Sequence, residues 1–230
     1  MTESTVLTEP VSAMKEVLAA RASFYDLLAA LYFKPLSQEQ IDNIAAMNLS
    51  SYANVNDDFA QGVNDITRYL AKQNTGTRQE LAVDFTGAFG GTSSWKGLYA
   101  VPYESVFTSE EGLLFRDSFH EVYALFNQSG VRRAEGYDYP DDHLSFMCEF
   151  QAILSNRAIE ALGRGDKITA LDQITLSQRF LQEHILNWFD DFHSLALNLL
   201  KTRFYRGVMS ITRGFFALDL EVTDDLVAEL

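Results

Sequence analysis

Two acidic residues and a histidine follow a proline at Pro140-Asp141-Asp142-His143. Their oxygen and nitrogen atoms are metal ligands, and a carboxylate also pairs with the planar fork of an arginine guanidinium. The metal alternative is weak, because three consecutive helical residues point in different directions. No two of the four histidines stand at the i, i+3 or i+4 spacing that would place two ligands on one helix face. The group is therefore a better candidate for binding a cationic organic group.

A second set of candidate binding residues is aromatic or stands beside aromatic residues. Phe85 and Phe89 lie four apart on an expected helix, a spacing more common for core packing than for a groove. A loop that follows them contributes a proline, two aromatic rings and a hydroxyl, and such loops are often functional. The expected peptide-binding residues are Phe85, Phe89, Pro102, Tyr103, Ser105, Phe107, Asp141, Asp142 and His143.

These residues suit a peptide with adjacent arginines followed by an apolar stretch. Arginine forks match carboxylates such as Asp141 and Asp142, and an apolar helix fits an aromatic groove. Structural alternatives remain open: Pro140 fits a first helical turn, where the dipole favours acids, and Asp142 fits a helix cap. His143 also fits a hydrogen bond to loop backbone. If the two loops meet, they form one acidic cleft rimmed by aromatic residues.

Other chemistry has little support in this sequence. The glycines at residues 87–91 lack the Gly-Lys-Ser/Thr ending of a phosphate-binding loop. The single cysteine, Cys148, excludes a disulfide scaffold and stands among apolar residues, which predicts a buried small side chain rather than a nucleophile. His184 and Trp188 share a helix face and are expected in the core. We expect no catalytic residue, metal or cofactor.

The charge balance narrows the range of partners. The 230 residues carry 18 Lys plus Arg against 32 Asp plus Glu, a net charge of −14. This negative charge repels nucleic acid and attracts basic partners. The alternative is that it provides solubility and has no role in binding. No apolar run approaches the ~20 residues that span a bilayer, and residues 1–9 lack the pattern of a secretory signal. We expect a cytoplasmic protein without stable membrane insertion, either a monomer or a homodimer.

The elements that must position these residues are helical almost throughout. Apolar residues recur at steps of three and four over residues 14–32, 59–70 and 144–154, and less regularly over 171–189 and 192–218. Capping boxes are expected at Ser37, Thr77 and Ser118, each followed three residues later by Glu or Gln. Residues 90–118 and 131–139 are expected to be loops. The sequence predicts one all-α domain over residues 1–230 with about nine or ten helices. Its core covers about residues 11–218, and an acidic tail at 219–230 is expected to fray.

Five segments in order resemble the TorD/DmsD family of redox-enzyme maturation chaperones. They are residues 24–35 (FYDLLAALYFKP), 84–89 (DFTGAF), 101–107 (VPYESVF), 139–144 (YPDDHL) and 180–189 (FLQEHILNWF). The fourth resembles the family's Glu-Pro-x-Asp-His-Leu motif, and the fifth its Phe-x-x-x-His-x-x-x-Trp helix. Tyr139 stands where the family usually has Glu, which removes one carboxylate, and Tyr103 stands where Trp is commoner.

The resemblance implies an all-helical, non-enzymatic chaperone. Members bind the twin-arginine signal peptide of a molybdenum-containing oxidoreductase and delay its export until the cofactor is inserted, and some bind the mature enzyme. The expected partners are therefore a twin-arginine leader peptide and the apo form of a molybdoenzyme. Two alternatives remain: a nucleotide-hydrolysing or metal-dependent helical enzyme, and an assembly factor that binds a folded redox-enzyme subunit independently of its leader.

Overall fold

A computed structural model describes residues 8–49 and 55–230. Residues 1–7 and 50–54 lie outside this description, and with them most of the segment that we compared with a secretory signal. The described chain is one all-α domain, as predicted. Its elements are α2 (Thr8–Phe33), α3 (Gln38–Ala46), α4 (Asp57–Leu70), α5 (Thr77–Ala88), α6 (Glu104–Thr108), α7 (Asp117–Gln128), α8 (Leu144–Gly163), α9 (Lys167–Phe180), the π-helical turn η2 (Leu181–Ile185), α10 (Leu186–Leu199) and α11 (Arg203–Glu229).

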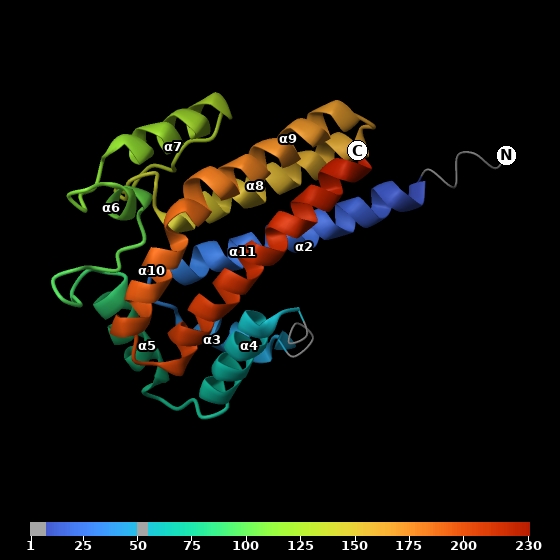
Figure 1. Ribbon diagram of the computed structural model, residues 1–230. Helices are drawn as coiled ribbons and strands as arrows, with labels where there is room; N and C mark the ends of the chain where they lie inside the picture. Colours follow the sequence, from blue (N-terminus) through green and yellow to red (C-terminus); the bar gives the residue numbers. More distant parts are fainter. Residues whose placement is uncertain (1–7, 50–54) are drawn as a thin grey trace.

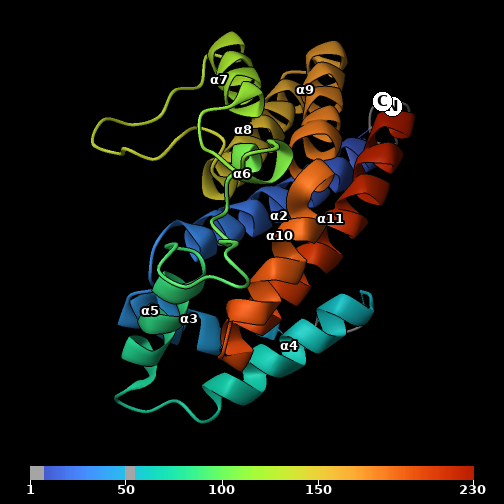
Figure 2. The same ribbon diagram turned by 60° about the vertical axis from the view of Figure 1, so that its left-hand side comes forward.

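The long helices form the body of the protein. Helix α2 packs along α8, α8 packs against α9, and α11 runs beside them and crosses α4 (Figure 1). The short α6 and the helix α7 lie at one end of this body, where α6 contacts α10. The segment between α7 and α8 is a loop that projects from the helical body at the left of Figure 2. The two expected loop regions therefore lie at the same end of the molecule.

Local sequence signals set some helix ends and not others. Helix α2 ends at Phe33, two residues before Pro35, and Ser37 with Gln40 forms the predicted capping box of α3. The predicted box at Thr77 is wrong, because Gly76 is the cap residue and the Thr77 hydroxyl accepts from the Asn74 amide. The box at Ser118 is also wrong.

Ser118 lies inside α7, and its hydroxyl is 3.1 Å from that of Thr108 in α6. Its side chain joins two elements instead of capping one. The sequence pattern of a capping box is short enough to occur where tertiary contacts use the hydroxyl differently.

The C-terminal segment differs from the prediction. Helices α9, η2 and α10 are continuous over 167–199, and the break falls at residues 200–202 rather than near 190. Helix α11 then runs to Glu229, so residues 219–229 are helical, not frayed. Asp219 and Leu226 are buried, and Leu226 packs in a small apolar cluster with Met14 and Leu18 of α2. This burial fixes the last turns of α11.

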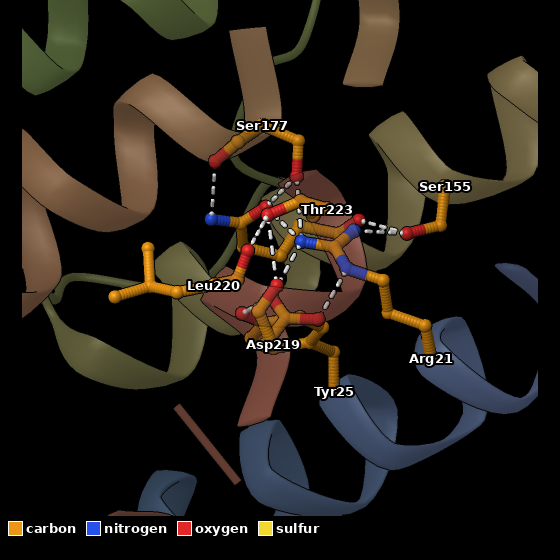
Figure 3. A network of polar contacts seen from close by, with 8 residues as sticks. Arg21, Tyr25, Ser155, Ser177, Asp219, Leu220 and Thr223 are labelled. Carbon is orange, nitrogen blue, oxygen red and sulfur yellow. Dashed lines mark hydrogen bonds and ion pairs between the residues drawn. The ribbon is translucent and has the colours of Figure 1, made fainter. Parts of the chain in front are cut away.

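A buried ion pair explains why an acidic residue lies inside α11. The Arg21 guanidinium donates to both carboxylate oxygens of Asp219, at 2.6 and 2.8 Å (Figure 3). The other acceptors and donors of this cluster are Ser155 and Gln151 of α8, Ser177 of α9 and Tyr25 of α2. A buried pair is weak evidence for stability, but its hydrogen bonds fix how four helices meet.

Two glycines allow α4 and α11 to approach closely. A Cβ atom on Gly62 would lie 2.5 Å from the Gly207 carbonyl oxygen, and one on Gly207 would lie 2.8 Å from the Gly62 carbonyl oxygen. Real Cβ atoms do not come this close to backbone, so neither position accepts a side chain without moving the helices apart. The crossing therefore depends on both residues being glycine.

Candidate functional site

The two expected binding loops do meet. The Glu104 amide donates to the Asp142 carbonyl at 3.2 Å, and the Leu144 amide donates to the Pro102 carbonyl at 2.9 Å. These backbone bonds hold the start of α6 against the start of α8. They also explain why α8 begins at Leu144 and not at Pro140: the preceding residues pair with another segment instead of entering the helix.

Asp142 is buried at this junction and holds α6. Its Oδ2 accepts a hydrogen bond from the Ser105 amide at 2.9 Å, at the N-terminus of α6. Burial raises the pKa of Asp142, and its hydrogen bonds with Ser105 oppose that shift. The expectation that Asp142 stabilises the first turn of its own helix is therefore corrected, since the carboxylate serves the neighbouring short helix.

His143 is the N-cap of α8. Its Nδ1 accepts a hydrogen bond from the Ser145 amide at 3.1 Å, which requires an unprotonated Nδ1. The ring lies between Tyr103, in edge contact at 4.8 Å between centroids, and Tyr139, stacked at 5.4 Å. Burial lowers the pKa of His143 to about 3, so the imidazole is neutral at pH 7. The sequence left two interpretations of His143 open, contact with a ligand and a hydrogen bond to backbone. The structure agrees with the second.

A buried acid that the sequence analysis missed completes the junction. The Oε1 of Glu104 accepts from the Asn187 side chain at 2.7 Å, and its Oε2 lies 3.2 Å from His184 Nδ1. His184 is part of the π-helical turn, a distortion that is frequent at functional sites. Burial raises the pKa of Glu104, which His184 and Asn187 oppose. No local pattern in the sequence marks Glu104, because both partners lie about 80 residues away.

The aromatic candidates pack inward. Phe85 and Phe89 are buried, form an edge-to-face pair and both contact Tyr205, which makes them core residues. Phe107 is half-buried and stacks on Trp188 with ring centroids 5.5 Å apart. Trp188 is fully buried. The structure therefore does not bring Phe85 and Phe89 into a groove with the acidic residues.

A pocket of about 240 Å³ opens beside Asp141, between the end of α2, the end of α7 and the first half of α8. It combines carboxylates with apolar rings, the chemistry that a cationic and apolar peptide needs. A second pocket of about 310 Å³ adjoins it and shares part of its wall. The lining residues of the first pocket are Phe33, Phe126, Val131, Arg132, Arg133, Ala134, Tyr137, Asp141, Phe146, Glu149, Phe150 and Ile153.

Asp141 and Glu149 are the two acidic residues of this wall. Burial raises the pKa of both carboxyls; the charge of Arg133 opposes the shift at Asp141, and the charge of Asp26 adds to it at Glu149. Glu149 was not among the expected site residues. A helical signal for it exists, because Glu149 follows Phe146 by three residues and precedes Ile153 by four, which places all three on one face.

The loop of residues 131–139 covers part of the pocket. The Nη1 of Arg133 lies 3.8 Å from Asp141 Oδ2, and Arg133 also donates to the Tyr139 carbonyl. Tyr137 and Tyr139 make edge contacts with Phe33 at the end of α2, at 5.3 and 5.6 Å between ring centroids. Both tyrosines remain about half exposed. The loop is thus attached to the helical body by the Arg133–Asp141 ion pair, by the ring contacts of Tyr137 and Tyr139 with Phe33, and by the stacking of Tyr139 on His143. At its start, the Val131 amide donates to the Phe126 carbonyl at 2.8 Å.

A larger apolar hollow of about 690 Å³ lies between α2 and α11, near the start of α4. Among the described residues that line it, the acidic one is Asp219, which is already paired with Arg21. A cationic ligand would find no available carboxylate among the residues that line it. The pocket beside Asp141 and Glu149 is therefore the better candidate for a basic peptide.

Metal and membrane sites find no support in the part of the chain that the structure describes. No group of three His, Cys, Asp or Glu side chains there could hold a metal ion. Cys148 is buried, as predicted. Within residues 8–49 and 55–230, no helix is both long and apolar enough to cross a membrane.

Comparison with known proteins decides the family. The family model described as nitrate reductase delta subunit matches residues 53–194, more than half of the chain. The chain belongs to this family. It is 27% identical over 217 residues to the chaperone protein TorD of Vibrio vulnificus, covering 90% of this chain and 97% of that protein. It is 26% identical over 215 residues to TorD of Vibrio cholerae, covering 91% and 94%.

A third relative is similar over a shorter part. TorD of Photobacterium profundum is 29% identical over 140 residues, covering 61% of this chain and 62% of that protein. These matches confirm the resemblance to the TorD/DmsD chaperones that the five sequence segments indicated. This member of the nitrate reductase delta subunit family is therefore a chaperone of the redox-enzyme maturation type and not an enzyme.

Proposed function

We propose that this chaperone binds the twin-arginine leader, the apo form, or both, of a molybdenum-cofactor oxidoreductase in the cytoplasm. Binding delays export of the client until its cofactor is inserted. The observation that carries the proposal is the pocket beside Asp141 and Glu149, which joins two carboxylates to a wall of phenylalanines. The similarity to TorD chaperones over nine tenths of the chain supports the same conclusion.

The pocket suits a leader peptide for two physical reasons. Two adjacent guanidiniums pair with Asp141 and Glu149. The bond to Asp141 is the stronger of the two because that carboxyl is nearly buried, whereas Glu149 is an exposed residue of the same wall. The apolar stretch that follows the arginines packs on the more accessible apolar side chains of the pocket, those of Phe33, Tyr137 and Ile153. The net charge of −14 draws the basic end of the leader toward the protein.

Neutral variants of the two acids test this proposal. Asp141→Asn and Glu149→Gln each remove one charge-assisted contact, so each weakens leader binding by about tenfold or more, measured by titration calorimetry. The matched control is Glu183→Gln, which removes an exposed acid that pairs with Arg179 across one helical turn. Unchanged affinity in both pocket variants would place the leader elsewhere.

A second candidate function follows from the family match. A protein related to nitrate reductase delta subunits could act on a folded redox-enzyme subunit without contacting its leader. Pull-down of the apo client with and without its leader separates the two functions. Loss of binding on leader deletion supports leader recognition, and equal binding supports the folded-subunit alternative.

A further inference from the structure

The protein carries its own pair of adjacent arginines beside the candidate pocket. Arg132 and Arg133 stand in the loop between α7 and α8, and both line the two adjoining pockets. The chain as a whole is poor in positive charge, with 18 Lys and Arg residues, these two included, against 32 Asp and Glu residues. An arginine pair at the acidic wall is the same chemistry that the proposed function assigns to the leader.

Arg133 forms an ion pair with Asp141, the carboxylate to which an arginine of the leader would bind. Its guanidinium lies 3.8 Å from Asp141 Oδ2 and donates to the Tyr139 carbonyl in the same loop. Asp141 is nearly buried, and Arg133 keeps about a third of its side chain exposed. Since the ion pair is longer than a hydrogen bond, a bidentate contact from another arginine would be the stronger one.

The attachments of the loop allow it to be displaced. Beyond Arg133, the loop is held by the edge contacts of Tyr137 and Tyr139 with Phe33 and by the stacking of Tyr139 on His143. Gly130 and Gly136 have φ values of +65° and +91°, a conformation that glycine adopts freely. Release of one ion pair and three ring contacts would expose Asp141 and the apolar wall without unfolding a helix.

We infer that Arg132-Arg133 is an internal competitor for the leader: Arg133 occupies Asp141 and keeps the pocket covered until the arginine pair of a leader replaces it. The inference rests on the proposed function, since it assigns the regulation of the same site. The competition lowers the affinity for every leader, and it favours peptides that supply arginine because only these form the stronger pair with Asp141.

The test is leader binding by Arg133→Gln and by the double variant Arg132→Gln/Arg133→Gln. Removal of the competitor tightens binding of a synthetic twin-arginine leader by about three- to tenfold and raises its association rate. The matched control is Arg179→Gln, which removes the same charge from an exposed ion pair on α9 and changes affinity by less than about twofold. Calorimetry gives the affinity, and stopped-flow fluorescence gives the rate.

Hydrogen exchange without leader tests the covered pocket independently of any peptide. Amides of residues 131–139 exchange faster in Arg133→Gln than in Arg179→Gln if the ion pair holds the loop. If wild type binds the leader while Arg133→Gln binds it equally or more weakly, the competitor is disproved and the proposed function stands. If wild type binds no leader, the proposed function fails first and the competitor fails with it.

Discussion

At the residue level, the acids of the Pro140-Asp141-Asp142-His143 segment divide by what they contact. Asp142 is fully buried and accepts from the Ser105 amide, whereas Asp141 borders a pocket and faces Arg133. Sequence reasoning proposed both as partners for a guanidinium. It could not separate them, because the contact that buries Asp142 comes from a residue 37 positions away.

His143 makes the stability of the protein depend on pH. Its folded-state pKa of about 3 lies below the unfolded value of 6.5, so its stabilising contribution is complete above pH 6.5 and is lost as pH falls toward 3. Between pH 7 and pH 5 this residue alone removes about 2 kcal/mol of unfolding free energy. His143→Asn keeps a side chain that caps a helix but does not titrate there.

Urea denaturation at pH 7 and pH 5 measures the free energy of unfolding of wild type and of His143→Asn. The variant loses about 2 kcal/mol less than wild type on going from pH 7 to pH 5. Lost packing lowers its stability equally at both values and leaves this difference intact. An identical pH dependence in the two proteins would show that His143 takes up a proton in the folded state as readily as in the unfolded one.

At the level of elements, hydrophobic periodicity predicted which segments are helical, because the apolar faces recur every three or four residues. It did not predict where helices end. The start of α8 is displaced from Pro140 to Leu144 by backbone bonds to residues 102 and 104. The C-terminal part of α11 is held at Asp219 by Arg21, which is 198 positions away. Both contacts join residues that are far apart in the sequence, so no pattern in a short stretch of sequence reveals them.

The crossing of α4 and α11 gives a prediction at this level. Gly62→Ala forces a Cβ atom against the Gly207 carbonyl oxygen and Ile211, so it destabilises the protein by about 1–3 kcal/mol. Gly163→Ala at the end of α8 is the matched control, because its Cβ would meet only Lys15 Nζ at 3.8 Å.

Chemical denaturation of the two variants checks this difference. Alanine has the higher helix propensity, so Gly163→Ala is neutral or stabilising by up to about 1 kcal/mol. Equal stability of Gly62→Ala and wild type would mean that the two helices can separate without cost.

At the level of the whole molecule, the Arg21–Asp219 cluster joins α2, α8, α9 and α11, as Figure 3 shows. Arg21→Met leaves the Asp219 carboxylate buried without its cation and costs about 3–5 kcal/mol. The double variant Arg21→Met/Asp219→Leu removes both charges and recovers much of that loss. Arg179→Met, in an exposed pair, is the control and costs at most about 1 kcal/mol.

Thermal and urea unfolding of these three variants measure the contribution of the cluster. A double variant as unstable as Arg21→Met would mean that the loss of stability comes from the lost hydrogen bonds of the cluster and not from the unpaired charge.

The expectation that residues 219–230 fray was wrong for a reason that involves the whole molecule. It was based on the acidic composition of the segment, and composition does not reveal that Asp219 is buried against Arg21.

The candidate site also belongs to this scale, because the end of α2, the loop after α7 and the face of α8 build it together. The sequence motifs indicated that the protein is a chaperone, but they left open whether the two loops meet. They did not predict that Glu149 lines the pocket or that a loop covers it. Both depend on how distant helices pack.

The most direct test of the account is calorimetric titration of the wild-type protein with a twin-arginine leader and with its Lys-Lys variant. We expect the arginine peptide to bind at micromolar protein and the lysine peptide to bind about tenfold more weakly, because lysine cannot form bidentate pairs with Asp141 and Glu149. No detectable binding of either peptide at that concentration would contradict it.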